Sequence, residues 1–563
     1  MIGMKNRSFL VQMLLLLVFT LAISSAQAAE RLDFWVSPDG EKSTMAISWY
    51  TAGKSTYILL PGNADPSQLK IGFSGADSVS IDGQPVHCGD SASMLVPGQE
   101  VVLSTSRKQY TLKVRRGSPN IPALYLTTES GSLDYVHKRK GNKEAGTLVF
   151  VSAEGTVEYD GALTHIKIRG NSSTTFAKKN YQIKLAKGAD LCHMGKSKTW
   201  ILTGNYRDKS MLRNQITLDM ARYSGLAYTP EHIPAEVYIN HEYMGLYLFS
   251  EKIMIDEDRI AIRDLEAETE SLNDQALSSY ALVGSKAVKP GRFKAYAIPN
   301  NPEDITGGYL VEYEAYASRY KDEPSSYHTK RTATLVVKSP EYCSEEQMTY
   351  ISGFMQSFEN AIFAKDGIDP ASGRHYSELV DMDSLVKKYL LEEISKNYDG
   401  NNSSMFFYKP SDAESTKAFA GPAWDYDSSY GSYAQAHNAR KLVTGKGLWI
   451  AAETGGKYWW PTLYKQPDFF KAMTQTYAST FRPAIRILLG QQTDPQGRLL
   501  SLDAYADSIR DSVSMTLIRW PRQKKSSTVA QTGYTFEENI EYLRTFLTER
   551  LRYLDSVWMT NEQ

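Results

Sequence analysis

The sequence of 563 residues contains only three cysteines, Cys88, Cys192 and Cys343. So few cysteines exclude a fold held by a disulfide framework, and no two of them have zinc-finger spacing. We expect isolated thiols and a fold stabilised by packing. Positive and negative charges nearly balance, with 63 Lys and Arg against 64 Asp and Glu, so no overall basic field favours a nucleic-acid partner.

The chain also lacks two common catalytic signatures. Neither His-Glu-x-x-His nor Gly-x-Ser-x-Gly occurs, which removes the usual anchors of metalloproteases and α/β-hydrolases. The only long apolar run lies near the N-terminus, between Lys5 and Arg7 on one side and the small residues 26–28 on the other. This pattern predicts a secretory signal over residues 1–28, rather than a membrane anchor. We therefore expect an exported protein, periplasmic or extracellular, with no transmembrane segment after cleavage.

The length and the 42% hydrophobic content predict two to four folded domains. Residues 29–127 contain short alternating stretches separated by Gly, Pro, Asp and Ser, a spacing typical of a small β-sandwich. We assign this module no chemistry. Its expected strands are Thr44–Tyr50, Ser55–Leu60, Leu69–Phe73, Val101–Ser104 and Tyr110–Val114.

Residues 128–340 are predicted to form a β-rich lobe. One helix, Lys209–Tyr223, interrupts the strands, and Asp208 is its expected N-cap. Residues 266–301 are polar and predict a surface excursion. The expected strands are Leu148–Ser152, Thr164–Ile168, Tyr181–Leu185, Glu236–Asn240, Tyr243–Phe249, Gly308–Glu314 and Thr332–Lys338.

Residues 341–563 are predicted to form a helix-rich lobe, interrupted by strand-like pieces at Ser404–Tyr408 and before Trp424. The whole chain is therefore expected to be α+β, with two lobes that meet where ligand sites commonly lie. The expected helices are Glu345–Phe363, Met382–Ile394, Pro467–Leu488, Leu502–Arg519 and Phe536–Trp558.

The densest polar cluster is Trp424-Asp425-Tyr426-Asp427, directly after a strand-like piece. In an extended chain, Asp425 and Asp427 point to the same side. Carboxylates at this spacing suit Mg²⁺ or Mn²⁺, which bind few protein carboxylates and leave room for phosphate oxygens. The spacing is equally typical of turns beside Gly431, so it does not decide between a metal site and a turn.

A second cluster follows the helix that ends near Ser395. Asp399 lies there before Gly400 and Asn402, and a strand begins a few residues later. An aspartate in this position could act as a base beside a metal-binding amide. The alternative is an Asx turn with a helix-terminating glycine.

The third cluster is a strand that runs into a loop of small residues, where backbone amides could hold phosphate. Lys178, Lys179 and Lys184 follow the loop, and alternation places Lys184 on the same face as Gln182. A single glycine is a weak phosphate-loop signal, and a lone lysine is usually part of a solvated strand face. The loop consists of Arg169, Gly170, Asn171, Ser172 and Ser173.

Five motifs together resemble the spore coat protein H (CotH) kinase family, an atypical branch of the protein-kinase-like fold. Their order and spacing match this family from about Leu124 to the C-terminal helices. The resemblance implies an α+β, bilobal, atypical protein-kinase-like body behind an N-terminal β-sandwich module. The motifs are Ile166–Lys184, Asn205–Asn214, Val237–Glu251, Asn397–Tyr408 and Gly421–Gly431.

The resemblance further implies that ATP binds between the lobes and that its γ-phosphoryl group is transferred to a Ser or Thr hydroxyl of a protein substrate. Asp399 would accept the hydroxyl proton, and Asp425 would hold Mg²⁺, with Asp427 and Asn402 as helpers. The loop from Arg169 to Ser173 would cover the phosphates.

Lys184 would pair with the α- and β-phosphates, as the strand lysine of kinases does, and Glu251 would lie near the adenine. The sequence departs from ordinary kinases here, because helix Lys209–Tyr223 contains no Glu and only Asp219 could pair with Lys184. Lys178 or Lys179 could contact the phosphates instead. Arg213 could bind phosphate or brace the helix.

Other departures keep a second class of function open. The chain contains no His-Arg-Asp, Asp-Phe-Gly or Ala-Pro-Glu sequence. A kinase-like scaffold can lose its chemistry and persist as a surface, adhesion or scaffold protein. A carbohydrate-active enzyme would suit the many Tyr and Trp residues, but no acid and nucleophile pair is identifiable. Trp459-Trp460 and Thr444–Gly456 fit either a substrate platform or plain packing.

Overall fold

The computed structural model describes residues 32–284, 290–314, 323–331, 333–432, 439–452, 458–521 and 535–559. The protein is α+β, as the sequence predicts, and it divides into two compact units. Among the described residues, the smaller unit comprises 32–60, 64–116 and 241–243, and the larger unit comprises the rest. The predicted signal peptide lies outside the described residues.

The smaller unit consists of a three-stranded sheet, in the order β2-β1-β5, and a six-stranded sheet, in the order β3-β4-β9-β8-β6-β7. The sequence predicts a module over residues 29–127; the N-terminal part of this unit extends to Arg116, and residues 241–243 also belong to the unit. The strands are β1 (Asp33–Ser37), β2 (Ile47–Ser48), β3 (Tyr50–Ala52), β4 (Ser55–Leu60), β5 (Lys70–Ser74), β6 (Val79–Ile81), β7 (Gln84–Val86), β8 (Glu100–Thr105) and β9 (Gln109–Arg116).

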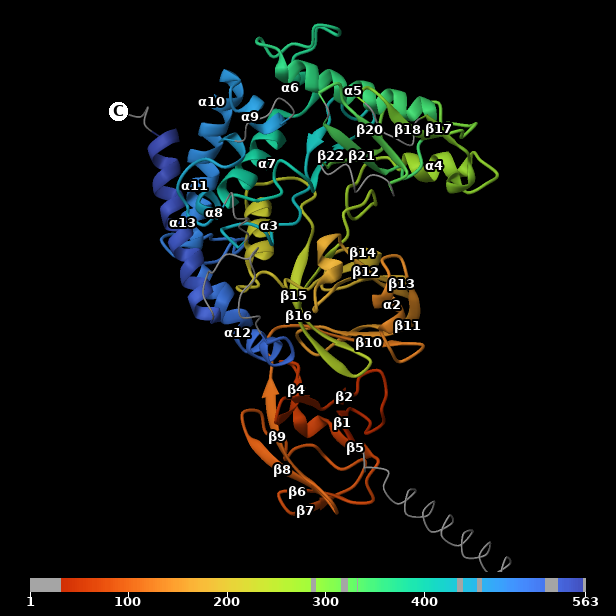
Figure 1. Ribbon diagram of the computed structural model, residues 1–563, viewed down its shortest axis with the longest axis vertical. Coiled ribbons are helices and arrows are strands. Elements are labelled where there is room, and N and C mark those ends of the chain that lie inside the picture. Colours follow the sequence, from red (N-terminus) through yellow and green to blue (C-terminus); the bar gives the residue numbers. More distant parts are fainter. Residues whose placement is uncertain are drawn as a thin grey trace, which may run out of the picture. The chain divides into compact units, whose positions relative to one another are not determined.

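The larger unit begins with a closed β-barrel in the order β10-β11-β12-β13-β14-β16-β15 (Figure 1). Alternation along β12 places Ile166 and Ile168 in the apolar core of the barrel and leaves Lys167 and Arg169 on its outer face. The barrel strands are β10 (Ala123–Thr128), β11 (Glu144–Val151), β12 (Val157–Arg169), β13 (Asn180–Asp190), β14 (Lys196–Thr203), β15 (His232–Ile239) and β16 (Glu242–Glu251). Neither β10 nor β14 is among the strands predicted from the sequence.

A seven-stranded sheet follows, in the order β17-β18-β20-β21-β19-β22-β23. One face carries Val311 and Phe407, which belong to the core formed with the helices, and the other carries Leu310, Glu312 and Phe406. The strands are β17 (Leu282–Gly284), β18 (Phe293–Tyr296), β19 (Tyr309–Tyr313), β20 (Ser325–His328), β21 (Thr334–Ser339), β22 (Met405–Lys409) and β23 (Phe419–Ala420).

The predicted surface excursion 266–301 is wrong in part. It contains α4 (Leu265–Ser271) at its start, but it also supplies β17 and β18. These two strands lie at one end of the seven-stranded sheet. Edge strands are short and tolerate polar residues, so their sequence carries little of the apolar alternation by which strands are recognised.

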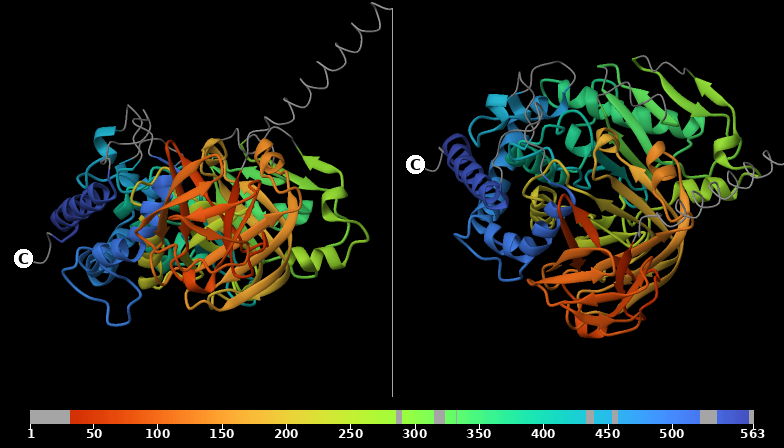
Figure 2. Two further views of the ribbon diagram at one scale, coloured as in Figure 1. Left: turned by 90° about the horizontal axis from the view of Figure 1, so that it is seen from below. Right: turned by 60° about the horizontal axis from the view of Figure 1, so that its bottom comes forward.

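The predicted helices are confirmed, apart from their ends and a π-helical turn at Tyr477–Phe481 that divides the fourth. In every view, the C-terminal helix α13 and the β17–β18 edge lie on opposite sides of the larger unit (Figures 1 and 2). The helices are α2 (Asp134–Lys138), α3 (Arg213–Tyr223), α5 (Glu345–Phe363), α6 (Tyr376–Leu379), α7 (Met382–Ser395), α8 (Ala439–Leu442), α9 (Trp459–Leu463), α10 (Pro467–Thr476), α11 (Arg482–Leu488), α12 (Leu502–Arg519) and α13 (Phe536–Trp558).

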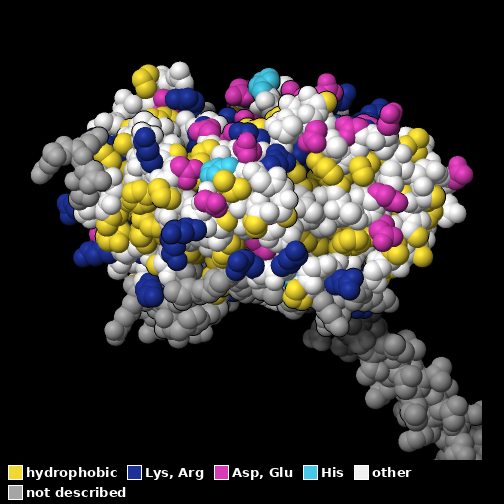
Figure 3. Space-filling view, turned by 90° about the horizontal axis from the view of Figure 1, so that it is seen from above, with side chains coloured by type: hydrophobic (Ala, Val, Ile, Leu, Met, Phe, Trp, Pro, Cys, Tyr) yellow, Lys and Arg dark blue, Asp and Glu magenta, His cyan; other side chains and the backbone are white. Residues whose placement is uncertain are grey.

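Basic and acidic side chains are interspersed on the face shown in Figure 3. Over the described ranges, no helix combines the length and the apolar character that crossing a bilayer requires. The three cysteines are unpaired thiols, as the sequence predicts.

Candidate active site

The loop that carries Asp399 is built where α7 meets β22. The helix ends at Lys396, which adopts the left-handed conformation with φ of 47°. The chain then turns, and the carbonyl of Asp399 accepts hydrogen bonds from the amides of Asn402 (2.7 Å) and Ser403 (2.9 Å). Buried Trp460 supports the turn by donating a hydrogen bond to the Gly400 carbonyl at 3.0 Å. The paired tryptophans therefore serve packing here, while residues 453–457 lie outside the described chain.

The loop that carries Asp425 lies against the Asp399 loop. Ser404 Oγ donates to Asp425 Oδ2 at 3.5 Å, and Asn397 Nδ2 donates to the Asp425 carbonyl at 3.4 Å. The amide of Tyr398 donates to the Ser428 carbonyl at 3.2 Å. The structure thus brings together two acidic clusters that the sequence predicts separately.

The predicted motif Asn205–Asn214 braces the Asp425 loop. Arg213 is fully buried, is paired with Asp208, and donates from Nε to the Ser429 carbonyl at 3.0 Å. Asn214 Oδ1 accepts from the Tyr426 amide at 2.7 Å. Arg213 is therefore a bracing residue. Asp208 is not the N-cap, because α3 begins after Leu212. Its carboxylate accepts from the backbone amide of Arg213 at 2.8 Å and also pairs with the buried Arg213 guanidinium.

Asp427 lies two residues beyond Asp425 and accepts from Ser428 Oγ at 2.9 Å. Burial, followed by the negative charge of Asp425, raises the pKa of Asp427 to about 7. Asn402 donates from Nδ2 to the Tyr398 carbonyl at 3.2 Å. In the described part of the chain, no three His, Cys, Asp or Glu side chains form a metal cluster. Two carboxylates close enough to repel each other nonetheless suit Mg²⁺, which takes few protein ligands.

Arg169 extends from the end of β12 toward the Asp425 loop. Its guanidinium lies 5.0 Å from the centre of the Trp424 ring. Burial lowers the pKa of Arg169, and the charges of Asp425 and Glu312 oppose that effect. The predicted phosphate-covering loop and the predicted metal loop therefore face each other, although they are far apart in the sequence.

The remainder of the predicted loop is a tight turn. Gly170 has φ of 95°, and a Cβ atom there would lie 2.0 Å from Ser173 Oγ, so glycine is required. Ser172 belongs to a 3₁₀ turn, Ser172–Thr175, and Asn171 accepts from Lys140 Nζ at 3.0 Å. Lys179 donates to the carbonyls of Thr174 and Phe176, both at 2.9 Å, and so braces the turn.

Lys184 is exposed on the outer face of the barrel. It lies opposite His165 and Thr199 in the strand register, and Arg169 lies opposite Asn180, four residues away. Four residues of strand span about 13 Å. The only acidic residue of α3, Asp219, accepts from the Tyr505 hydroxyl at 2.7 Å and lies 3.4 Å from His232.

Glu251 occupies the end of β16. It forms an ion pair with Arg259 at 2.9 Å and accepts from the Glu231 amide at 2.9 Å. Burial raises its pKa to about 7. The structure thus gives Glu251 a bracing contact. The next residue, Lys252, lies near Lys167 and Arg169, whose positive charges lower its pKa.

Sequence reasoning missed Lys167 and Lys252 as neighbours of Arg169, and Lys338 as a neighbour of Lys252. Lys167 was recognisable in principle, because strand alternation places it on the same face as Arg169. Lys338 comes from β21 and lies 3.7 Å from Glu312 of β19. Its position depends on how the sheet packs against the barrel, which no local pattern reveals.

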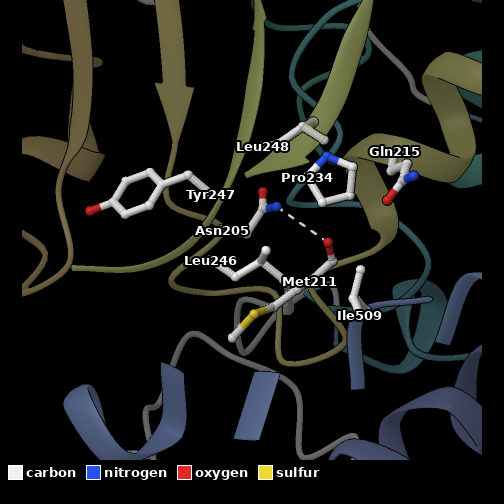
Figure 4. A pocket seen from close by; sticks show the side chains of 8 residues that line it. All are labelled: Asn205, Met211, Gln215, Pro234, Leu246, Tyr247, Leu248 and Ile509. Atoms are coloured by element: carbon white, nitrogen blue, oxygen red, sulfur yellow. Dashed lines mark hydrogen bonds between the residues drawn. The ribbon is translucent and has the colours of Figure 1, made fainter. Parts of the chain in front are cut away.

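A separate small cavity of about 10 Å³ lies beside β15, β16, α3 and α12 (Figure 4). Asn205 donates to the Met211 carbonyl there at 3.3 Å, and the ring of Tyr247 points away from the other side chains. No charged side chain lines this cavity, so it offers no counterpart for phosphate. The Asp399 and Asp425 loops remain the candidate active site.

The barrel thus brings Arg169 against Trp424, beside the joined loops that bear Asp399 and Asp425. The chain belongs to the CotH kinase family, since the family model described as CotH kinase protein matches residues 166–554. The match includes both acidic loops and the end of β12. A search of curated proteins finds no match.

Proposed function

We propose that the protein is an exported, Mg²⁺-dependent protein kinase that transfers the γ-phosphoryl group of ATP to Ser or Thr hydroxyls of a protein substrate. The observation that carries this proposal is the joined pair of loops bearing Asp399 and Asp425, with Arg169 held against Trp424 beside them. The family match supports the kinase-like class. The phosphoacceptor remains a protein of unidentified sequence.

The side chains at the Asp425 loop fit a divalent cation. Asp425 and Asp427 would hold Mg²⁺ or Mn²⁺, with Asn402 as a further oxygen ligand, because these cations prefer carboxylate and amide oxygens. The bound metal would neutralise charge on the phosphate oxygens. Asp425 has φ of 66°, a conformation that Asn also tolerates, so an Asp425→Asn variant keeps the backbone while removing the charge.

Asp399 would accept the proton of the substrate hydroxyl while the hydroxyl oxygen bonds to the γ-phosphorus and ADP leaves. Its loop is rigidly supported by Trp460 and by the bonds to the Asp425 loop, which is what precise placement of a base requires. Arg169 would bind phosphate oxygens as a charge-assisted donor.

The test is thermal melting with Mg²⁺, with ATP and with both, for wild type, Asp425→Asn and Asp399→Asn. A ligand at about 100 times its dissociation constant adds about 2.7 kcal/mol of stability. We expect a shift that requires both ligands, persists in Asp399→Asn and is lost in Asp425→Asn. Asp77→Asn, in the smaller unit and exposed, is the matched control. No shift in wild type would favour a non-catalytic surface or scaffold protein.

Transfer itself is measured with labelled ATP and a mixture of exported proteins. Asp399→Asn is expected to bind nucleotide and to lose transfer. Export is tested separately by cell fractionation and by sequencing the mature N-terminus, which is expected to begin at Ala29. Retention of the full-length chain in the cytoplasm would contradict the proposed location.

A further inference from the structure

Three cations share the face of the barrel that lies toward the Asp425 loop. Lys167 and Arg169 alternate on β12, and Lys252 directly follows β16. The strand register runs from Lys167 through Gln182 and Ile201 to Ser250, so β12 and β16 are joined by one continuous row across the barrel. Ile201 on this outer row is fully buried, which shows that the row is covered by the rest of the unit.

Lys167 and Lys252 have no hydrogen-bond or ion-pair partner among the described residues. Within the ranges that the structure describes, neither ammonium group has a hydrogen-bond acceptor or an ion pair, although both side chains are half-buried. Arg169 has its ring contact with Trp424 and no ion pair among those residues. Buried ammonium groups are normally paired, so the two lysines need an explanation.

The charges around Lys252 are predominantly positive. Burial lowers its pKa most, and the charges of Lys167, Arg169 and Lys338 lower it further, whereas only Glu341 opposes them. The pKa of Lys167 is likewise lowered by burial and by Lys143 and Arg169. The free protein thus holds like charges together out of water, which destabilises it.

We infer that Lys167 and Lys252, together with Arg169, form a seat for the polyphosphate chain of the nucleotide, and that their mutual repulsion destabilises the free protein until this anion binds. The inference rests on the proposed function for the identity of the ligand. It assigns phosphate binding to residues of β12 and of the end of β16, where the family resemblance implies Lys184.

The seat is suited to a polyanion that also reaches a metal. Arg169 contacts Trp424, the neighbour of Asp425, so an anion bound to the three cations would extend toward the Asp425 loop. Three positive charges without an ion pair among the described residues match a triphosphate better than a single phosphate, because each terminal oxygen needs its own donor. An isolated carboxylate ligand would leave most of the repulsion in place.

The experiment uses the mature protein in EDTA with inorganic tripolyphosphate as the probe, so that the metal site does not contribute. Lys252→Met is compared with Lys187→Met, an exposed charge-matched control on β13. We expect Lys252→Met to melt at a higher temperature than wild type without ligand and to bind tripolyphosphate about tenfold more weakly. Lys187→Met is expected to change neither property, and Asp425→Asn is expected to retain tripolyphosphate binding.

A combined gain of stability and loss of binding is the signature, because a merely structural lysine would lose stability when replaced. If Lys252→Met melts lower or binds tripolyphosphate as wild type does, the inference is overturned. The same holds if wild type fails to bind the probe in EDTA. Transfer from Mg²⁺-ATP is measured on the same wild-type sample, so loss of the proposed function and loss of the anion seat are observed independently.

Discussion

The larger unit contains two groups of buried cations that differ in how they are satisfied. In the first group, Lys396 donates to three carbonyl groups, and Lys409 donates to two carbonyls and to Asp412. Arg213 is likewise paired with Asp208. These side chains tie loops together, because a buried donor is stabilising only when its acceptors are present.

The second group, Lys167, Arg169 and Lys252, has no such acceptors among the described residues. Both groups are desolvated, so burial alone does not explain the difference. The cations of the first group are paired within the protein, whereas those of the second group would be paired only when an anion binds. Unpaired buried charge therefore marks the candidate ligand site more specifically than charge itself.

The largest expected effect tests this contrast with two arginines. Arg213→Met removes the partner of buried Asp208 and is expected to lower the free energy of unfolding by about 4 kcal/mol. Arg169→Met removes a ring contact and charge interactions of both signs but no ion pair among the described residues, so we expect a change of about 1 kcal/mol or less. Urea denaturation followed by circular dichroism measures both. Equal losses for the two variants would remove the distinction between the groups.

An intermediate effect is expected from the pH dependence of Lys178, which donates to the Leu246 carbonyl. Burial lowers its pKa to about 7, with Glu236 opposing. An unfolded lysine titrates at about 10.4, so between these values the unfolded chain binds one more proton. Stability relative to Lys178→Met should therefore rise by about 1 kcal/mol per pH unit above pH 7 and stay constant below it.

Denaturation of wild type and Lys178→Met at about pH 6, about pH 8 and about pH 9.5 measures this difference. Lys187→Met serves as the control, because its exposed side chain should give a difference that does not change with pH. A flat difference between wild type and Lys178→Met would show that Lys178 keeps an ordinary pKa in the folded protein.

The smallest effect on stability is expected from Lys184→Met. Since Lys184 is exposed, its replacement should change the free energy of unfolding by no more than about 0.5 kcal/mol. ADP binding, measured by calorimetry, should weaken less than in Lys252→Met. A greater loss of ADP affinity in Lys184→Met would return the phosphate contact to Lys184, as the family resemblance implies.

Local pattern predicted much of the fold. Helices such as Glu345–Phe363 carry strong 3.6-residue periodicity, and β12 and β13 alternate cleanly, so their existence followed from the sequence. Strands β14, β17 and β18 are among those missed, because polar or mixed residues hide their alternation. Asp208 was misplaced because α3 begins only at Arg213, where Asp208 accepts from the backbone amide and also pairs with the guanidinium.

The two acidic loops were predictable for a similar reason. Asp399 follows the end of a helix and Asp425 follows a strand, and both positions depend on a few neighbouring residues. Which groups surround them was not predictable, as Glu251 shows. Glu251 pairs with Arg259, which lies beyond the end of its strand. Alternation along the strand predicts neither this pairing nor the side of the barrel on which a ligand would lie.

The sequence by itself determined the α+β class, the order of the elements and the positions of the acidic loops, because propensity, periodicity and turn residues act over short stretches of chain. Only the tertiary structure decided which cations are paired. The packing of segments distant in sequence places Arg169 over the Trp424 ring and brings Lys252 close enough to Lys167 for their charges to repel. Desolvation and the distances between charges arise from that packing, and they separate the cations that hold the fold from those left for a ligand.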